Sequence, residues 1–212
     1  MRGKPIQSKG ILAKLLEKGI EILLNKECKK IGKTDINIIA SSLEIIKGII
    51  PKIHISAKDI NYKNLLFDEI ELEANNLKIR FKISNKELNF KNDFSMEFKV
   101  SLSENSLKTI LFSDDWNWMG DLITKKILDQ DKLYDIKIKN DQLFIKASKD
   151  KQTINYKEEK VTIRTEDGKL YLENKAYKKY IKIPLEDKVC IENVNIKHNL
   201  IIIYANSSIS FN

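Results

Sequence analysis

The sequence predicts an α+β fold: a long N-terminal amphipathic helix packed on a curved antiparallel β-sheet, with a helical hairpin inserted mid-chain. Three observations lead to this class. Apolar residues recur at helical spacing over about residues 9–31, alternate with polar residues after Thr34, and return to helical spacing between Ser103 and Ile127 before alternation resumes. A chain of 212 residues with 42% hydrophobic content can bury a full core, and its three Pro and seven Gly do not form linkers. We therefore expect one domain over residues 1–212, with residues 1–8 disordered.

The first predicted helix has an apolar face that covers about half of its circumference. Lys14, Glu17, Lys18 and Glu21 occupy the opposite side. An apolar face this broad is wider than a single neighbouring helix needs, so we expect it to lie across a sheet. Gly32 predicts the C-terminal end of this helix. The apolar face consists of Ile11, Leu12, Leu15, Leu16, Ile20, Ile22 and Leu23.

Alternating apolar residues then predict half-buried strands. The residues between them are polar or charged, as in Glu69, Glu71 and Glu73, so one face of the sheet is expected to be wet. The apolar positions are Ile36 and Ile38; Ile53, Ile55 and Ala57; Ile70, Leu72 and Ala74; Leu77, Ile79, Phe81 and Ile83; and Phe94, Met96, Phe98, Val100 and Leu102.

Two short helices are predicted next, the first capped by Ser103 and the second by Ser113 or Asp114. Beyond Leu133 the alternation resumes, and we expect an antiparallel meander. Its tight hairpin turns are predicted at Asn140-Asp141, Asp167-Gly168 and His198-Asn199.

The formal net charge of +8 comes almost entirely from Lys, since the chain has only three Arg. Arg supplies the bidentate contacts that read bases, so sequence-specific binding to nucleic acid is not expected. No interleaving of aromatic and basic residues is visible that would favour general nucleic-acid binding either. Lys suffices for attraction to anionic surfaces, although a genome-wide bias in amino-acid composition explains the excess charge equally well.

Targeting and redox features are few. Cys28 and Cys190 lack the spacing of a zinc site, so we expect buried free thiols. The apolar stretch from Ile11 to Leu24 is interrupted by charged residues, which is unlike a secretory signal or a membrane span. A cytoplasmic protein is therefore expected, with a peripheral position at a membrane as a further option.

No catalytic, metal-binding or cofactor site is predicted. His54 and His198 have no cluster of carboxylates or thiols beside them and are expected to be surface imidazoles. No glycine-rich phosphate loop is present. Trp116 and Trp118 could anchor the chain at a membrane interface, but packing of one ring in the core with partial exposure of the other is the simpler interpretation.

The amount of apolar side chain on one sheet face leaves two interpretations open. It could form a filled core, or it could line an elongated cavity for an apolar ligand. Periodicity does not separate the two.

The segment from Gly48 to Ala57, followed by Ile60-Asn61-Tyr62-Lys63-Asn64-Leu65, resembles the LmeA-like family, whose members share a Gly-x-Ile-Pro strand entry and a Tyr-x-Gly-Leu turn. Asn64 stands where the family usually has Gly, and Asn tolerates the left-handed conformation of such a turn. The resemblance covers about residues 38–127. It implies a fold similar to the tubular lipid-binding proteins and affinity for anionic glycerophospholipids.

On this resemblance we expect a non-enzymatic protein that holds acyl chains on its inward face while surface Lys meets a membrane. The alternative is a protein-interaction or scaffold domain with a filled core, whose protein partner the sequence does not identify. The side chains expected to contact lipid are Leu12, Leu15, Leu16, Ile20, Leu23, Ile53, Ile55, Ile70, Leu72, Ile79, Phe94, Met96, Phe98 and Val100.

Overall fold

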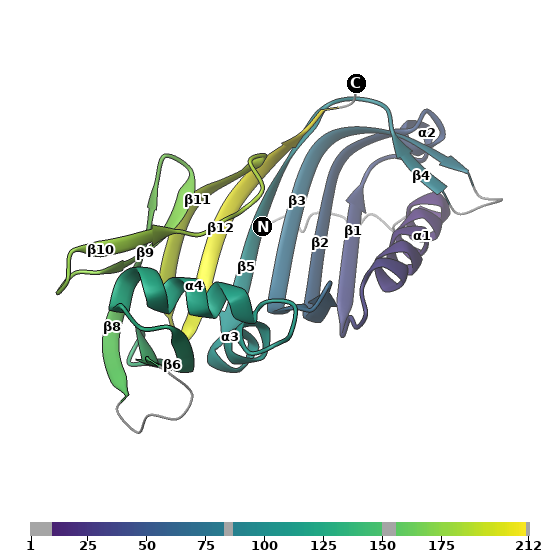
Figure 1. Ribbon diagram of the computed structural model, residues 1–212. Coiled ribbons are helices and arrows are strands. Elements are labelled where there is room, and N and C mark those ends of the chain that lie inside the picture. Colours follow the sequence, from purple (N-terminus) through teal and green to yellow (C-terminus); the bar gives the residue numbers. More distant parts are fainter. Residues whose placement is uncertain (1–9, 83–86, 150–155, 211–212) are drawn as a thin grey trace, which may run out of the picture.

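The computed structural model describes residues 10–82, 87–149 and 156–210 (Figure 1). Within these ranges the chain forms four helices and two sheets, and every pair of adjacent strands is antiparallel. The expected α+β class with mostly antiparallel sheet is confirmed. The prediction for residues 1–8 lies outside the described residues.

The first sheet has seven strands and two chemically different faces. In one row across the sheet, Ile36, Ile55, Leu72, Phe98 and Ala205 lie side by side on the apolar face, and the neighbouring row is polar. This alternation follows from the period-2 geometry of a strand. The strands, in spatial order, are β1 (Thr34–Ile39), β2 (Ile49–Tyr62), β3 (Leu65–Lys82), β5 (Phe94–Ser103), β12 (Leu200–Ile209) and β11 (Val189–Lys197), and β4 (Glu87–Phe90) pairs with β3.

Helix α1 (Ile11–Glu27) covers the apolar face at the β1 end of this sheet. It ends earlier than predicted, because the backbone after Cys28 turns to pair with β2: the Lys29 N–H donates to the Asn61 carbonyl over 2.8 Å. The predicted stop at Gly32 is therefore wrong. A short helix that was not predicted, α2 (Ser42–Ile46), connects β1 to β2.

The inserted helical hairpin is present as α3 (Glu104–Leu111) and α4 (Asn117–Leu128). The Ser103 hydroxyl accepts from the Ser106 N–H, so its predicted capping role is confirmed. The predicted cap of the second helix is wrong, because Trp116 occupies the N-cap position and makes no capping hydrogen bond with its side chain.

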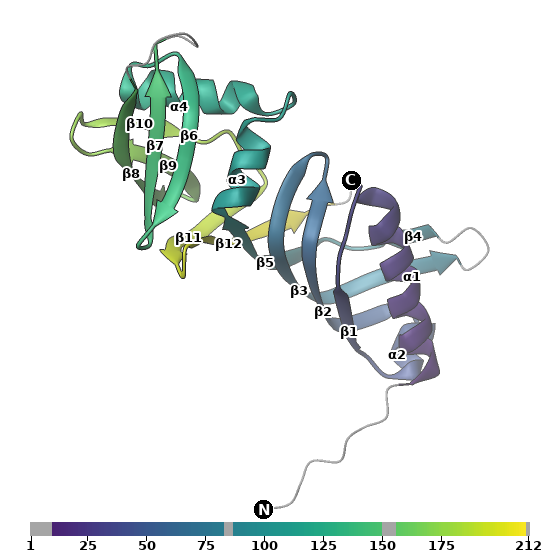
Figure 2. The same ribbon diagram turned by 90° about the horizontal axis from the view of Figure 1, so that it is seen from below.

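The second sheet packs against α4, at the end of the molecule away from α1 (Figures 1 and 2). The prediction of one meander over the second half of the chain is wrong, because β11 and β12 leave this sheet and pair beside β5 in the first one. All three predicted hairpin turns are confirmed, with positive φ at both central residues of each. The five strands, in spatial order, are β10 (Lys179–Lys182), β9 (Lys169–Asn174), β8 (Lys157–Glu166), β7 (Gln142–Ser148) and β6 (Lys132–Lys139).

Two hydrophobic clusters hold these layers together. One lies between α1 and the first sheet and includes Leu16, Ile20 and Ile53. The other includes residues from α3, α4 and both sheets, with Ile127 of α4 completely buried in it. The two sheets therefore share one core. Helix α1 packs on the first sheet at its β1 end, α3 packs against β3 and β5 of the same sheet, and α4 packs against the second sheet.

Candidate functional site

A groove of about 640 Å³ lies between α1, α2 and the far end of β3. Its walls are mostly aliphatic, and its polar side chains are all cationic. The lining residues are Leu12, Leu15, Leu16, Lys18, Gly19 and Ile22 of α1; Ile45, Ile46, Lys47 and Gly48 of α2 and its end; and Ile79 and Arg80 of β3.

The helical spacing of α1 places two apolar stripes side by side. Leu12, Leu15 and Ile22 recur at intervals that share one face of a helix, and they face the groove. Leu16 and Ile20 lie on the adjacent face and are buried against the sheet. The unusually broad apolar face seen in the sequence therefore serves two surfaces, one in the core and one in the groove.

Gly48 determines the position of the groove wall that lies opposite α1. Its φ is +72°, in the left-handed region, and its carbonyl accepts a 2.7 Å hydrogen bond from the Ile79 N–H. A Cβ at this position would clash with the Ile79 carbonyl oxygen. Only glycine allows the end of α2 to come this close to β3, and this contact brings Lys47 and Arg80 into the same groove.

The charge at the groove is positive. Lys18 pairs with Glu21 over 2.8 Å at an exposed position on α1. Lys47 and Arg80 form no ion pair with any residue that the structure describes. Because the lining contains no carboxylate, the groove combines an aliphatic surface with cationic side chains.

The groove is open on one side. Leu15 is 60% exposed, Ile46 is 71% exposed and Ile22 is 39% exposed. An occupant would therefore be covered by protein on one flank while its other flank faced the surroundings.

The fourteen residues predicted to contact lipid do not converge on one place. Leu12, Leu15, Leu16 and Ile79 line the groove. Of the remaining ten, two belong to α1 itself and eight lie on the apolar face of the first sheet. Ile20, Ile53 and Phe94 are buried in the α1 cluster, Ile55, Leu72 and Met96 pack at its margin, Phe98 and Val100 pack against the second cluster, and Leu23 and Ile70 are half-buried.

Sequence reasoning missed the contribution of α2. The available signal was a capping box: the Ser41 hydroxyl accepts from the Glu44 N–H, and the Glu44 carboxylate accepts from the Ser41 N–H. This pattern directly precedes the apolar pair Ile45-Ile46 and marks a helix start. The five-residue helix was too short for its periodicity to stand out.

A second, polar groove of about 210 Å³ lies on the wet face of the first sheet. Three of its four carboxylates have partners: Lys52 pairs with Glu73, Lys99 pairs with Glu71, and the Asn206 side-chain amide donates to Glu192. The hydrogen bond from Lys52 lowers the pKa of Glu73, which therefore remains an anion. His54 lines this groove without a metal-binding group around it, since no such group of side chains occurs within the described residues. The arrangement is a solvated ion-pair surface.

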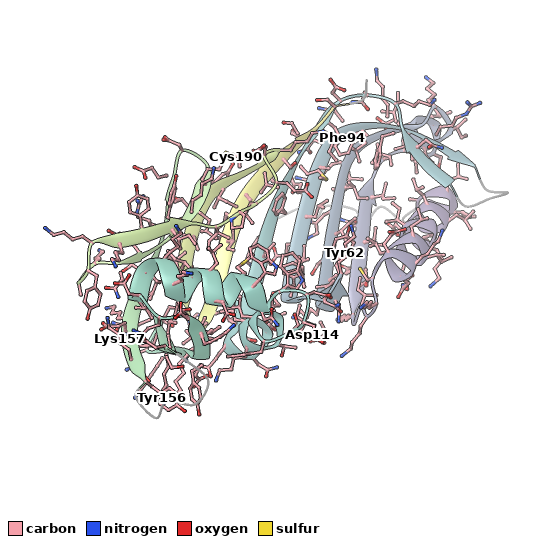
Figure 3. The ribbon with its side chains drawn as sticks, viewed as in Figure 1. Tyr62, Phe94, Asp114, Tyr156, Lys157 and Cys190 are labelled. Atoms are coloured by element: carbon pink, nitrogen blue, oxygen red, sulfur yellow. The ribbon has the colours of Figure 1, made fainter. Side chains whose placement is uncertain are left out.

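The remaining sequence candidates are distributed over both ends of the molecule. Trp116 packs against the core and Trp118 is 46% exposed, so the predicted division between the two rings is confirmed. The prediction of buried thiols is wrong, because Cys190 is exposed on the polar phase of β11 (Figure 3) and Cys28 is only half-buried.

Among the described residues, none of the helices has the length and apolar character needed to cross a bilayer. Comparison of the chain with models of protein families, with curated proteins and with solved structures gave no match. The resemblance to the LmeA-like family therefore stays a prediction, and the geometry of the groove carries the functional argument.

Proposed function

We propose that this protein binds lipid without catalysing a reaction, and that an acyl chain lies in the groove between α1, α2 and β3. The observation that supports this function is the composition of the groove: aliphatic side chains, three cations and no carboxylate among the lining residues. An amphiphile with an apolar chain and an anionic headgroup matches both properties. An anionic glycerophospholipid is the corresponding ligand class.

The size of the groove suits part of a lipid. Its volume of about 640 Å³ falls within the range of about 300–1,000 Å³ that small-molecule sites occupy. Removing a methylene group from water contributes about 0.8 kcal/mol, so six methylenes along the groove would contribute roughly 5 kcal/mol before the costs of association. Association costs at least about 4 kcal/mol, so the apolar contact alone supports only weak binding, and the cations must contribute through the headgroup.

The packing of α1 determines where the acyl chain can lie. Leu16 and Ile20 belong to the same buried cluster as Ile38 and Ile53, so side chains fill the space directly beneath the helix at these positions. In the expected arrangement of a helix on a curved sheet, lipid would then bind along the outer flank of α1 and not inside an enclosed tube. An open flank favours lipid sensing or short transfers at a membrane surface over transport through water.

The test is native mass spectrometry after incubation with dioleoylphosphatidylglycerol, followed by extraction of the bound lipid. The groove-filling variant Leu12→Trp and the charge reversal Arg80→Glu should both lose the lipid adduct. Lys139→Glu is the matched control, because Lys139 is exposed on β6 in the other sheet. A wild-type protein without adduct, or an adduct that survives both groove variants, would contradict the proposal.

The alternative function is a protein-interaction domain, and the exposed Ile and Leu side chains around the groove favour it as the second candidate. It predicts that the wild type binds no phospholipid and that Arg80→Glu leaves its behaviour with lipid unchanged. The same mass-spectrometric experiment therefore separates the two functions.

A further inference from the structure

Exposed apolar side chains gather at one end of the molecule, where the first turn of α1 meets α2. Ile11 is 78% exposed, Leu43 is 70% exposed and Ile46 is 71% exposed. Leu15 and Ile39 beside them are also more than half exposed. We call these five residues the apolar tip.

The tip is contiguous, because its elements touch. A Cβ on Gly10, the residue that precedes α1, would lie 3.1 Å from the Ser42 hydroxyl oxygen at the start of α2. Figure 2 shows the start of α1 and α2 side by side at the end of the molecule farthest from the second sheet. Monomeric proteins rarely expose a contiguous apolar surface, and such a surface commonly marks a site of interaction with a protein or a membrane.

The charges around the tip identify the kind of partner. Lys14, Lys18, Lys47 and Arg80 flank it. The neighbouring carboxylates of Glu17 and Glu44 accept hydrogen bonds from the backbone N–H groups of Ile38 and Ser41, and Glu21 pairs with Lys18. These carboxylates keep their charge, so the four cations exceed the three anions by one, and the tip is an apolar surface whose border has a net charge of +1.

A second copy of the chain fits this border poorly. A two-fold contact through the tip would bring two borders of the same net charge together, so charge complementarity does not favour it. An anionic bilayer instead offers phosphates to the Lys and Arg side chains and an apolar layer just below them to the Ile and Leu side chains.

We infer that the apolar tip docks the protein on an anionic bilayer, with Ile11, Leu43 and Ile46 inserted at headgroup level. This inference rests on the proposed function, since the lipid groove opens beside the tip and shares Leu15 and Ile46 with it. Docking in this orientation brings the open flank of the groove to the membrane, where a lipid enters without crossing water.

The experiment is flotation with vesicles of dioleoylphosphatidylcholine, with and without dioleoylphosphatidylglycerol. The double variant Ile11→Asp/Leu43→Asp removes two tip residues that do not line the groove. Phe112→Asp is the control, because Phe112 is 46% exposed on the other side of the fold, at the end of α3. We expect the double variant to lose about tenfold or more of its vesicle binding and the control to keep it.

A fluorescence measurement complements the loss of vesicle binding. Leu43→Trp should become quenched by phospholipid brominated on its acyl chains, beyond the quenching that the wild type shows from Trp116 and Trp118. Urea unfolding of each variant checks that the fold is retained.

The docking proposal and the lipid-binding proposal fail in different ways. If the double variant still yields a lipid adduct in native mass spectrometry but no longer floats, the tip docks and the groove binds. If it floats like the wild type, docking through the tip is refuted whether or not the groove binds lipid. If the wild type forms a dimer that the double variant loses, and neither protein floats, a second copy occupies the tip and the inference is refuted.

Discussion

Replacing Gly48 by Ala should destabilise the fold and open the groove wall. Gly48 sits at φ +72° where the end of α2 meets β3, and its carbonyl accepts the Ile79 N–H. The added methyl would lie much closer to the Ile79 carbonyl oxygen than van der Waals contact allows, and this oxygen is backbone and cannot rotate away. The chain must therefore shift at this residue.

The expected cost has two sources. A left-handed backbone costs a non-glycine residue about 1–2 kcal/mol. Displacement of Gly48 also weakens its 2.7 Å hydrogen bond with Ile79, and the loss of such a bond costs about 0.5–1.5 kcal/mol. Together they give a loss of about 1.5–3.5 kcal/mol in the free energy of unfolding. In a chain of this size each kcal/mol lowers the Tm by about 2–4 °C.

Urea titration followed by far-UV circular dichroism measures this change. The neighbouring substitution Lys47→Ala is the control, because Lys47 is exposed and forms no ion pair with the described residues, and its effect should stay within about 0.5 kcal/mol. If Gly48→Ala changed the stability no more than Lys47→Ala does, the geometry assigned to the α2–β3 junction would be wrong.

Three further substitutions test the fold around the site. Ile127→Ala should cost about 2–5 kcal/mol in urea unfolding, since Ile127 is completely buried in the core that the two sheets share. Glu17→Ala removes the carboxylate that accepts the Ile38 N–H over 2.9 Å, so it should cost about 1–3 kcal/mol and speed up amide exchange at Ile38. Glu104→Gln should cost about 0.5–1 kcal/mol at neutral pH. The hydrogen bond from Lys108 lowers the pKa of Glu104 in the folded state, so this difference should shrink as the pH falls below about 4.3, and a difference that grew there would contradict the assignment.

The sequence predicted the parts of the fold that local chemistry determines. The three hairpin turns followed from residues that tolerate positive φ, and the Ser103 cap followed from its hydroxyl at a helix start. Both are decided within a few residues of chain. The same locality explains why the α+β class was predictable from a change of hydrophobic period.

Long-range pairing was not predictable in the same way. The strand alternation of Ile201, Ile203 and Ala205 fits either sheet, and only the structure shows that β12 pairs with β5. Likewise, Phe94 and Leu15 have the same apolar character in the sequence, yet one is buried and the other is 60% exposed. The groove depends on Gly48 and on the packing of α2, because they bring α2 and β3 next to each other. Sequence periodicity describes each segment alone and does not predict this contact.

The most direct test of the account uses a phosphatidylglycerol that carries a photoreactive diazirine on its acyl chain. After irradiation, mass spectrometry of the digested protein locates the labelled residues. We expect labels on Leu12, Leu15 and Ile22 of α1 and on Ile45 and Ile46 of α2, and we expect unlabelled phosphatidylglycerol to compete with this labelling. Labels confined to the second sheet, or spread over the surface without competition, would contradict the assignment of the groove as the lipid site.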